Sequence, residues 1–119
     1  MKTDLKRKSD LTRAMRDDSF VLKTKQQLIK DFAKVNIKFP NNFEFDITDR
    51  LEIERLVANE VVTLMERSER HLLQLLYVVD LSEKVFLKLT TQSDFLAKIA
   101  EHILYREAYK VWLRANYSN

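Results

Sequence analysis

Apolar side chains recur at helical spacing along most of this chain. In residues 20–35, Leu28, Phe32 and Val35 share one helix face, and Ser19 stands where an N-terminal cap is expected. A second stripe, rich in small residues, consists of Ala97, Ala100, Leu104, Ala108, Val111 and Ala115. The two patterns predict helices over Phe20–Val35 and Asp94–Ala115.

The longest helical pattern lies between these two segments. From Val57 to Val78, mostly apolar residues alternate four and three positions apart, and Ser68 and His71 fill two places in this seam. Thr48 precedes the pattern as a candidate N-terminal cap. An unbroken helix over Asp49–Val79 would be about 46 Å long, which is long for one small domain. Such a helix is expected either to kink or to pack against a partner.

A new helix start follows this long helix. The sequence Asp80-Leu-Ser-Glu83 has a capping residue followed by a glutamate three positions later. We therefore expect the long helix to end near Val79, with Asp80 capping a short helix over Leu81–Leu89. The long helix is therefore expected to turn or break at Val79–Asp80.

Residues 36–47 lack helical spacing. Apolar and polar residues alternate on both sides of Pro40-Asn41-Asn42, where asparagine can adopt the positive φ that glycine would supply. A short hairpin is one interpretation. We favour an extended loop that covers the helical core, because an isolated two-stranded ribbon is marginal in stability. Its covering side chains are Ile37, Phe39, Phe43, Phe45 and Ile47.

These elements predict an all-α fold. The expected architecture is an irregular antiparallel bundle of three main helices and a short fourth, with the Phe-rich segment as a connecting loop. Residues 1–18 mix charges with few apolar side chains, which predicts a basic, flexible tail. Residues 19–119 then form a single helical domain.

Composition excludes several classes of function. The chain has no glycine, no cysteine and one proline among 119 residues. Phosphate-cradling loops need glycine, and disulfides and thiolate zinc sites need cysteine. No run approaches the 18 apolar residues of a membrane span, and the N-terminus lacks the apolar core of a secretion signal. These features predict a cytoplasmic protein.

Charge is distributed unevenly around a net value of +3. Residues 20–43 carry five basic and one acidic side chain, whereas residues 44–69 carry three basic and eight acidic side chains. The two segments can complement each other, within one chain or between two. The basic half also permits phosphate contacts, from Lys6, Arg7, Lys8, Arg13, Arg16, Lys23, Lys25 and Lys30. Acidic residues in the tail oppose that alternative.

Candidate catalytic and metal-binding residues are few. His71 and His102 are the only histidines, and Glu66, Glu69 and Glu101 lie near them in the sequence. Their spacing does not match the Glu-x-x-His of helical metal sites, so we predict no metal or cofactor site. Ser68 and His71 are three residues apart, but no nucleophile elbow accompanies them. The sequence predicts no catalytic residue and no enzyme.

Apolar and aromatic residues supply a candidate interface. Tyr105, Tyr109 and Trp112 lie on the last predicted helix, and aromatic residues are enriched in the cores of interfaces. Leu64 lies in the apolar seam of the long helix. We expect self-association through Leu64, Tyr105, Tyr109 or Trp112, as a homodimer. The leading hypothesis is a non-catalytic protein–protein interaction or adaptor module; the alternative is a nucleic-acid-associated regulator.

One segment carries a resemblance. Residues 72–84, Leu-Leu-Gln-Leu-Leu-Tyr-Val-Val-Asp-Leu-Ser-Glu-Lys, resemble stretches in small uncharacterised bacterial all-helical proteins of no known function. The resemblance implies a helical fold and assigns no role to any residue.

Overall fold

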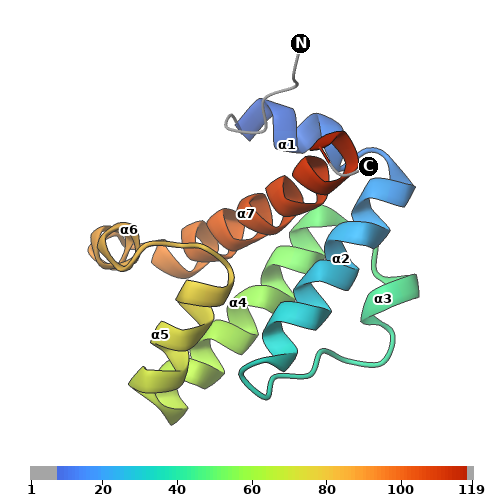
Figure 1. Cartoon of the computed structure of the whole chain (residues 1–119). Helices are drawn as coiled ribbons and strands as arrows, with labels where there is room; N and C mark the ends of the chain where they lie inside the picture. Colours follow the sequence, from blue (N-terminus) through green and yellow to red (C-terminus); the bar gives the residue numbers. More distant parts are fainter. Residues whose placement is uncertain (1–7, 118–119) are drawn as a thin grey trace.

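The computed structural model describes residues 8–117, and every regular element among them is a helix. Three long helices, α2, α4 and α7, pack together, and α7 contacts both of the others (Figure 1). This confirms the predicted all-α class with three main helices, although shorter helices are more numerous than predicted. The bounds are α1 Lys8–Ala14, α2 Asp18–Ala33, α3 Phe43–Asp46, α4 Arg50–Arg67, α5 Glu69–Val78, α6 Glu83–Leu89 and α7 Phe95–Tyr117.

Two long helices begin at caps one or two residues from the predicted ones. The Asp17 carboxylate, rather than Ser19, caps α2 by accepting from the backbone N–H groups of Ser19 and Phe20, at 2.9 and 3.2 Å. Asp49, rather than Thr48, caps α4 by accepting from the N–H of residue 52 at 3.1 Å. In both cases an aspartate satisfies N–H groups that lack helical partners.

The long helix predicted over residues 49–79 is broken. Ser68 has an extended backbone, with φ −167° and ψ 121°, and it ends α4. Its hydroxyl accepts from the His71 N–H at 3.3 Å, so the same residue caps α5. A straight helix of about 46 Å would also exceed the extent of the molecule along its longest principal axis, 39 Å. The break lets α5 pack back against α4.

Two helices end with residues in the left-handed region. Asn36 and Asp80 both have φ 62°, and they are the only positive-φ residues within the described range 8–117. After each, a backbone N–H returns to the preceding helix: Ile37 to Phe32 O at 3.0 Å and Leu81 to Leu76 O at 2.9 Å. This is the glycine-type helix ending, made here without glycine. Asp80 therefore ends α5 near the predicted break, and the prediction that it caps the next helix is wrong.

The cap of α6 is Ser82, two residues after the one predicted. Its hydroxyl accepts from the N–H of Val85 at 3.1 Å, and α6 starts at Glu83 rather than at Leu81. The positive φ that Asn41 or Asn42 could have adopted is found at Asn36 instead, at the end of α2.

Replacing Asn36 by glycine is expected to leave stability unchanged or slightly raised, whereas alanine should cost about 1 kcal/mol. A side chain with a Cβ strains the left-handed conformation, and asparagine tolerates it better than alanine. Urea unfolding followed by circular dichroism measures both variants. An Asn36→Ala protein as stable as Asn36→Gly would contradict this account of the helix ending.

The Phe-rich segment is a loop that contains one helical turn, α3, rather than a hairpin. Ile37, Phe39 and Phe43 are buried, which confirms that this segment covers the core. The Phe39 and Phe43 rings stack with centroids 4.2 Å apart, and Phe32 of α2 lies 5.0 Å from Phe39. Phe45 differs from the prediction: it is 70% exposed, because α3 turns it away from the core.

Part of the predicted tail is folded. Within residues 1–18, α1 places Leu11 against the rest of the protein with 1% of its surface exposed. The Thr12 hydroxyl accepts from the Arg50 guanidinium at 2.7 Å, which ties α1 to the start of α4. The tail prediction for residues 1–7 falls outside the described residues.

Candidate functional site

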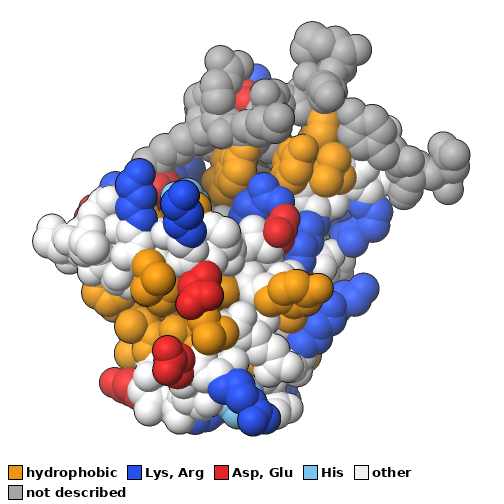
Figure 2. All heavy atoms as spheres, turned by 60° about the vertical axis from the view of Figure 1, so that its left-hand side comes forward, with side chains coloured by type: hydrophobic (Ala, Val, Ile, Leu, Met, Phe, Trp, Pro, Cys, Tyr) orange, Lys and Arg blue, Asp and Glu red, His pale blue; other side chains and the backbone are white. Residues whose placement is uncertain are grey.

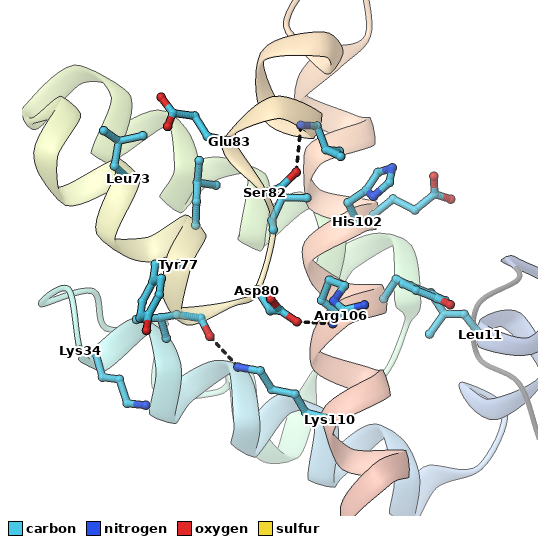
Figure 3. Close-up of a pocket in the computed structure, with 16 residues that line it drawn as sticks. Leu11, Lys34, Leu73, Tyr77, Asp80, Ser82, Glu83, His102, Arg106 and Lys110 are labelled. Atoms are coloured by element: carbon cyan, nitrogen blue, oxygen red, sulfur yellow. Dashed lines mark hydrogen bonds and ion pairs between the residues drawn. The ribbon is translucent and has the colours of Figure 1, made fainter. Parts of the chain in front are cut away.

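An open groove of about 1170 Å³ lies between α5, the linker Asp80–Ser82 and α7 (Figure 3). Leu11 of α1, Lys34 just after α2, and Glu83 and Val85 of α6 complete its lining. The groove therefore gathers side chains from segments that are distant in the sequence.

The α5 wall of the groove is apolar because of the register of this helix. Leu72, Leu75 and Leu76 point into the core and are almost fully buried. Leu73 and Tyr77, four residues apart, share the outer face and are 38% and 87% exposed. An apolar pair left in water on a groove wall is typical of a contact surface.

The polar side of the groove is built on α7. Arg106 forms an ion pair with Asp80, the left-handed residue at the end of α5. The same guanidinium lies 5.3 Å from the centre of the Tyr109 ring. These contacts fix the linker against α7, so the groove has a defined shape.

Lys110 joins three helices at the edge of the groove. Its ammonium donates to the Asp31 carboxylate of α2 at 2.6 Å and to the Val78 carbonyl at the end of α5 at 2.6 Å. It also lies 3.1 Å from Glu107 Oε2 on its own helix. A cation at the last carbonyls of a helix interacts favourably with the helix dipole. Lys110 thereby positions the groove wall.

Beneath Lys110 lies a buried carboxyl pair. Asp31 is 1% exposed and Glu107 is fully buried. Burial, followed by the hydrogen bond and the charge of Asp31, raises the pKa of Glu107 to about 9. Burial opposes ionisation of Asp31, but hydrogen bonds from Glu107, Lys110 and Gln27 lower its pKa. At neutral pH the pair therefore holds one proton, on Glu107, and one negative charge, on Asp31.

The seam between α2 and α7 continues this network. Arg114 donates to the Gln27 side-chain oxygen at 2.9 Å, one turn away from the pair Asp31–Lys110. The order of these contacts shows that the two helices run antiparallel. Inside the seam Lys110 contacts both carboxyl groups, and Arg114, at the far end of the row, is exposed.

The structure distributes the four predicted interface residues differently. Leu64 is fully buried in the protein's own core, and Trp112 is only 9% exposed. Tyr105 and Tyr109 are half-buried and stand in a row with Trp112, with ring centroids 6.5 and 6.0 Å apart. Tyr105 lines the groove. Of the four, the two tyrosines remain accessible to a partner.

The candidate chemical residues are not brought together. Ser68 caps α5 through the backbone of His71, so its hydroxyl is engaged in helix structure. His102 lines the groove, whereas His71 is not part of its lining. Within the part of the chain that the structure describes, no group of three or more potential ligands is placed to hold a metal ion.

The basic residues proposed to contact nucleic acid are split between surface and interior. Lys23 and Lys30 are exposed on α2, as are Arg13 and Arg16 near the start of the described chain. Lys25 is buried, its ammonium donating to the Ile47 carbonyl, and burial lowers its pKa although nearby carboxylates oppose this. The side chains of residues 6–8 lie outside the described part. On the face that Figure 2 draws, Lys and Arg side chains lie along the right-hand side and also at the upper left and the lower edge.

Sequence reasoning missed the buried pair Asp31 and Glu107 and their partner Lys110. A signal was present: Asp31 falls between Leu28 and Val35 at the spacing of the apolar stripe, where a charge is unusual. It is also the only acidic residue in the basic segment 20–43. The pairing itself depends on a tertiary contact between α2 and α7.

The chain matches no protein-family model, no curated protein and no solved structure. Among residues 8–117, no helix combines the length and apolar character needed to cross a lipid bilayer.

Proposed function

We propose that this chain is a non-catalytic protein–protein interaction module whose docking surface is the groove between α5 and α7. One observation carries the proposal: Leu73 and Tyr77 leave apolar and aromatic surface in water on a groove wall. Tyrosine supplies large contact area with a polar end, and such residues dominate binding energy at interface centres. Half-buried Tyr105 extends the same surface on the α7 side.

Rigidity of the groove supports the same proposal. Lys110 holds the end of α5 through the Val78 carbonyl, and Arg106 holds Asp80. A surface that is already in its binding conformation loses less entropy when a partner binds. The groove therefore has both the exposed apolar area and the fixed walls that a docking surface needs.

Self-association is the form of this function that we expect. Sedimentation equilibrium at micromolar concentrations and about 0.15 M salt, near physiological ionic strength, should show a reversible dimer of the 14.2 kDa chain. Tyr77→Glu should yield a folded monomer, because it places a charge on the contact surface. Leu51→Glu is the matched control, since Leu51 is 69% exposed but lies on α4, outside the groove lining.

The controls distinguish dimerisation through the groove from unfolding of a variant and from dimerisation through another surface. Circular dichroism should give the same helix content for both variants and the parent chain. A single monomeric species across a hundredfold dilution series would refute self-association. A dimer weakened equally by Leu51→Glu and Tyr77→Glu would refute the groove as its site.

The alternative function, binding of nucleic acid, is favoured by a separate observation. Lys23, Lys30 and Lys34 are exposed along one side of α2, and Arg114 of α7 lies beside them across the seam. Because Glu107 is neutral and buried, the carboxyl pair places less negative charge under these cations than two ionised carboxylates would. Retention on single-stranded DNA that falls steeply with salt would support this alternative over protein docking.

A further inference from the structure

The groove carries opposite charges at its two ends. Glu83, the first residue of α6, is exposed at one end, and Lys34, exposed after α2, stands at the other. Figure 3 shows them well apart, with Leu73 and Tyr77 on the α5 wall between them. Along its length the groove therefore presents an acidic, an apolar, an aromatic and a basic side chain, in that order.

Other charges of the groove are already engaged within the protein. Asp80 pairs with Arg106, and Glu101 lies 3.4 Å from the Arg50 guanidinium. Lys110 is held by Asp31. These groups need no partner from outside, so they do not select one.

The two end groups differ from these. Glu83 makes no ion pair with any described residue. Lys34 is 54% exposed and stands 3.4 Å from Asp31, whose closer partner is Lys110 at 2.6 Å. Glu83 is therefore available to a second molecule, and Lys34 can turn toward one while Lys110 keeps Asp31 paired. A partner of single charge sign would be attracted at one end of the groove and repelled at the other.

We propose that the occupant of the groove is a second copy of this chain, related by a two-fold axis that passes near Tyr77. This rests on the function proposed above and specifies its partner. A two-fold axis places each patch against its own inverted copy. The acidic end then meets the basic end twice, Glu83 opposite the partner's Lys34 in each case, while Leu73 and Tyr77 bury their apolar surface in the middle.

A charge-exchange experiment tests this arrangement. Glu83→Lys and Lys34→Glu are made separately in the full chain, and each is measured alone and in equimolar mixture by sedimentation equilibrium at low salt. Each variant alone places like charges together at both ends of its dimer. We expect its dissociation constant to rise about tenfold, because two exposed attractions become repulsions. The mixture restores opposite charges at both ends and should recover the parent affinity to within about twofold.

Matched controls use the same charge changes elsewhere. Lys23→Glu and Glu66→Lys alter exposed residues outside the groove lining, and neither should change dimerisation, alone or mixed. Helix content is checked for every variant, because Glu83 also stands in the first turn of α6. High salt should remove the differences among the variants while leaving the apolar contact.

The results distinguish failure of this two-fold arrangement from failure of the proposed function. If Tyr77→Glu abolishes the dimer but both charge variants dimerise like the parent chain, the groove is the interface and the two-fold pairing is wrong. Failure of the mixture to recover affinity overturns the pairing as well. Open-ended oligomers in place of a closed dimer would show head-to-tail association instead. A chain that stays monomeric under all conditions refutes the self-association of the proposed function together with this arrangement.

Discussion

Glu107→Gln is expected to stabilise the protein at neutral and alkaline pH, and to remove most of its loss of stability as the pH rises. Burial against Asp31 raises the pKa of Glu107 from 4.5 to about 9. The unfolded chain releases this proton near 4.5, whereas the folded chain keeps it. Between these values the unfolded state binds fewer protons, so the free energy of unfolding falls with increasing pH, by up to about 1.4 kcal/mol per unit.

The groups around Glu107 do not cancel this decrease in the free energy of unfolding with increasing pH. The lowered pKa of Asp31 adds stability that is lost only as the pH falls toward and below its ordinary value of 3.8, outside the window of Glu107. Lys110 has a raised pKa, so its contribution is complete throughout the window and is lost only above its ordinary value of 10.5. Gln27, which also hydrogen-bonds to Asp31, has no ionisable group.

Urea unfolding at pH 5, 7 and 8.5 measures the effect. Glutamine has the shape of protonated glutamate and can donate to Asp31, but it does not titrate. At pH 7 the variant should exceed the parent chain by about 3 kcal/mol, with a smaller difference at pH 5 and a larger one at pH 8.5. Glu66→Gln, at an exposed site, is the matched control and should follow the parent chain. Parallel pH profiles for Glu107→Gln and the parent chain would contradict the shared-proton assignment.

The helical class was predictable because it depends on local information. Apolar residues at spacings of three and four mark helix faces wherever the helix lies, and the absence of glycine removes many competing turns. The three long helices follow from that pattern. Their exact ends could not be predicted, because a helix start can offer two nearby capping residues, such as Thr48 and Asp49. Which of them caps the helix depends on the direction from which the preceding loop approaches.

The break at Ser68 was missed for a related reason. Serine fits a continuous apolar seam about as well as it fits an N-terminal cap, so the local pattern permits both. Tertiary packing decides: the break returns α5 onto α4. The groove depends on this event, since an unbroken helix would carry Leu73 and Tyr77 away from α7.

The pairing of the two buried carboxyl groups could not be predicted from a local pattern. Asp31 and Glu107 are far apart in the sequence, and Glu107 alone looks like an ordinary charged residue on a helix. Their shared proton exists only because α2 and α7 pack antiparallel and exclude water. A charge at an apolar-stripe position marks the place, but the identity of its partner requires the fold.

Phe43→Ala is expected to cost about 3–5 kcal/mol of stability, the range for removing a fully buried phenylalanine. The Phe43 side chain has no exposed surface, and its ring stacks on Phe39, which in turn packs against Phe32 of α2. Removing the ring leaves a cavity under the loop and withdraws the support of Phe39. The loss should therefore include contacts beyond those of Phe43 itself.

Phe45→Ala is the matched control for this loss, because it removes the same ring two residues away in the same short helix. Phe45 is 70% exposed, so its replacement should change the free energy of unfolding by no more than about 0.5 kcal/mol. Urea midpoints followed by circular dichroism compare the two variants with the parent chain. The sequence pattern alone treats both rings as core residues, whereas α3 turns only Phe43 inward. Equal losses from the two substitutions would favour the alternating pattern and contradict α3, whereas a large loss from Phe43→Ala alone would establish that this helical turn fixes the Phe-rich loop on the core.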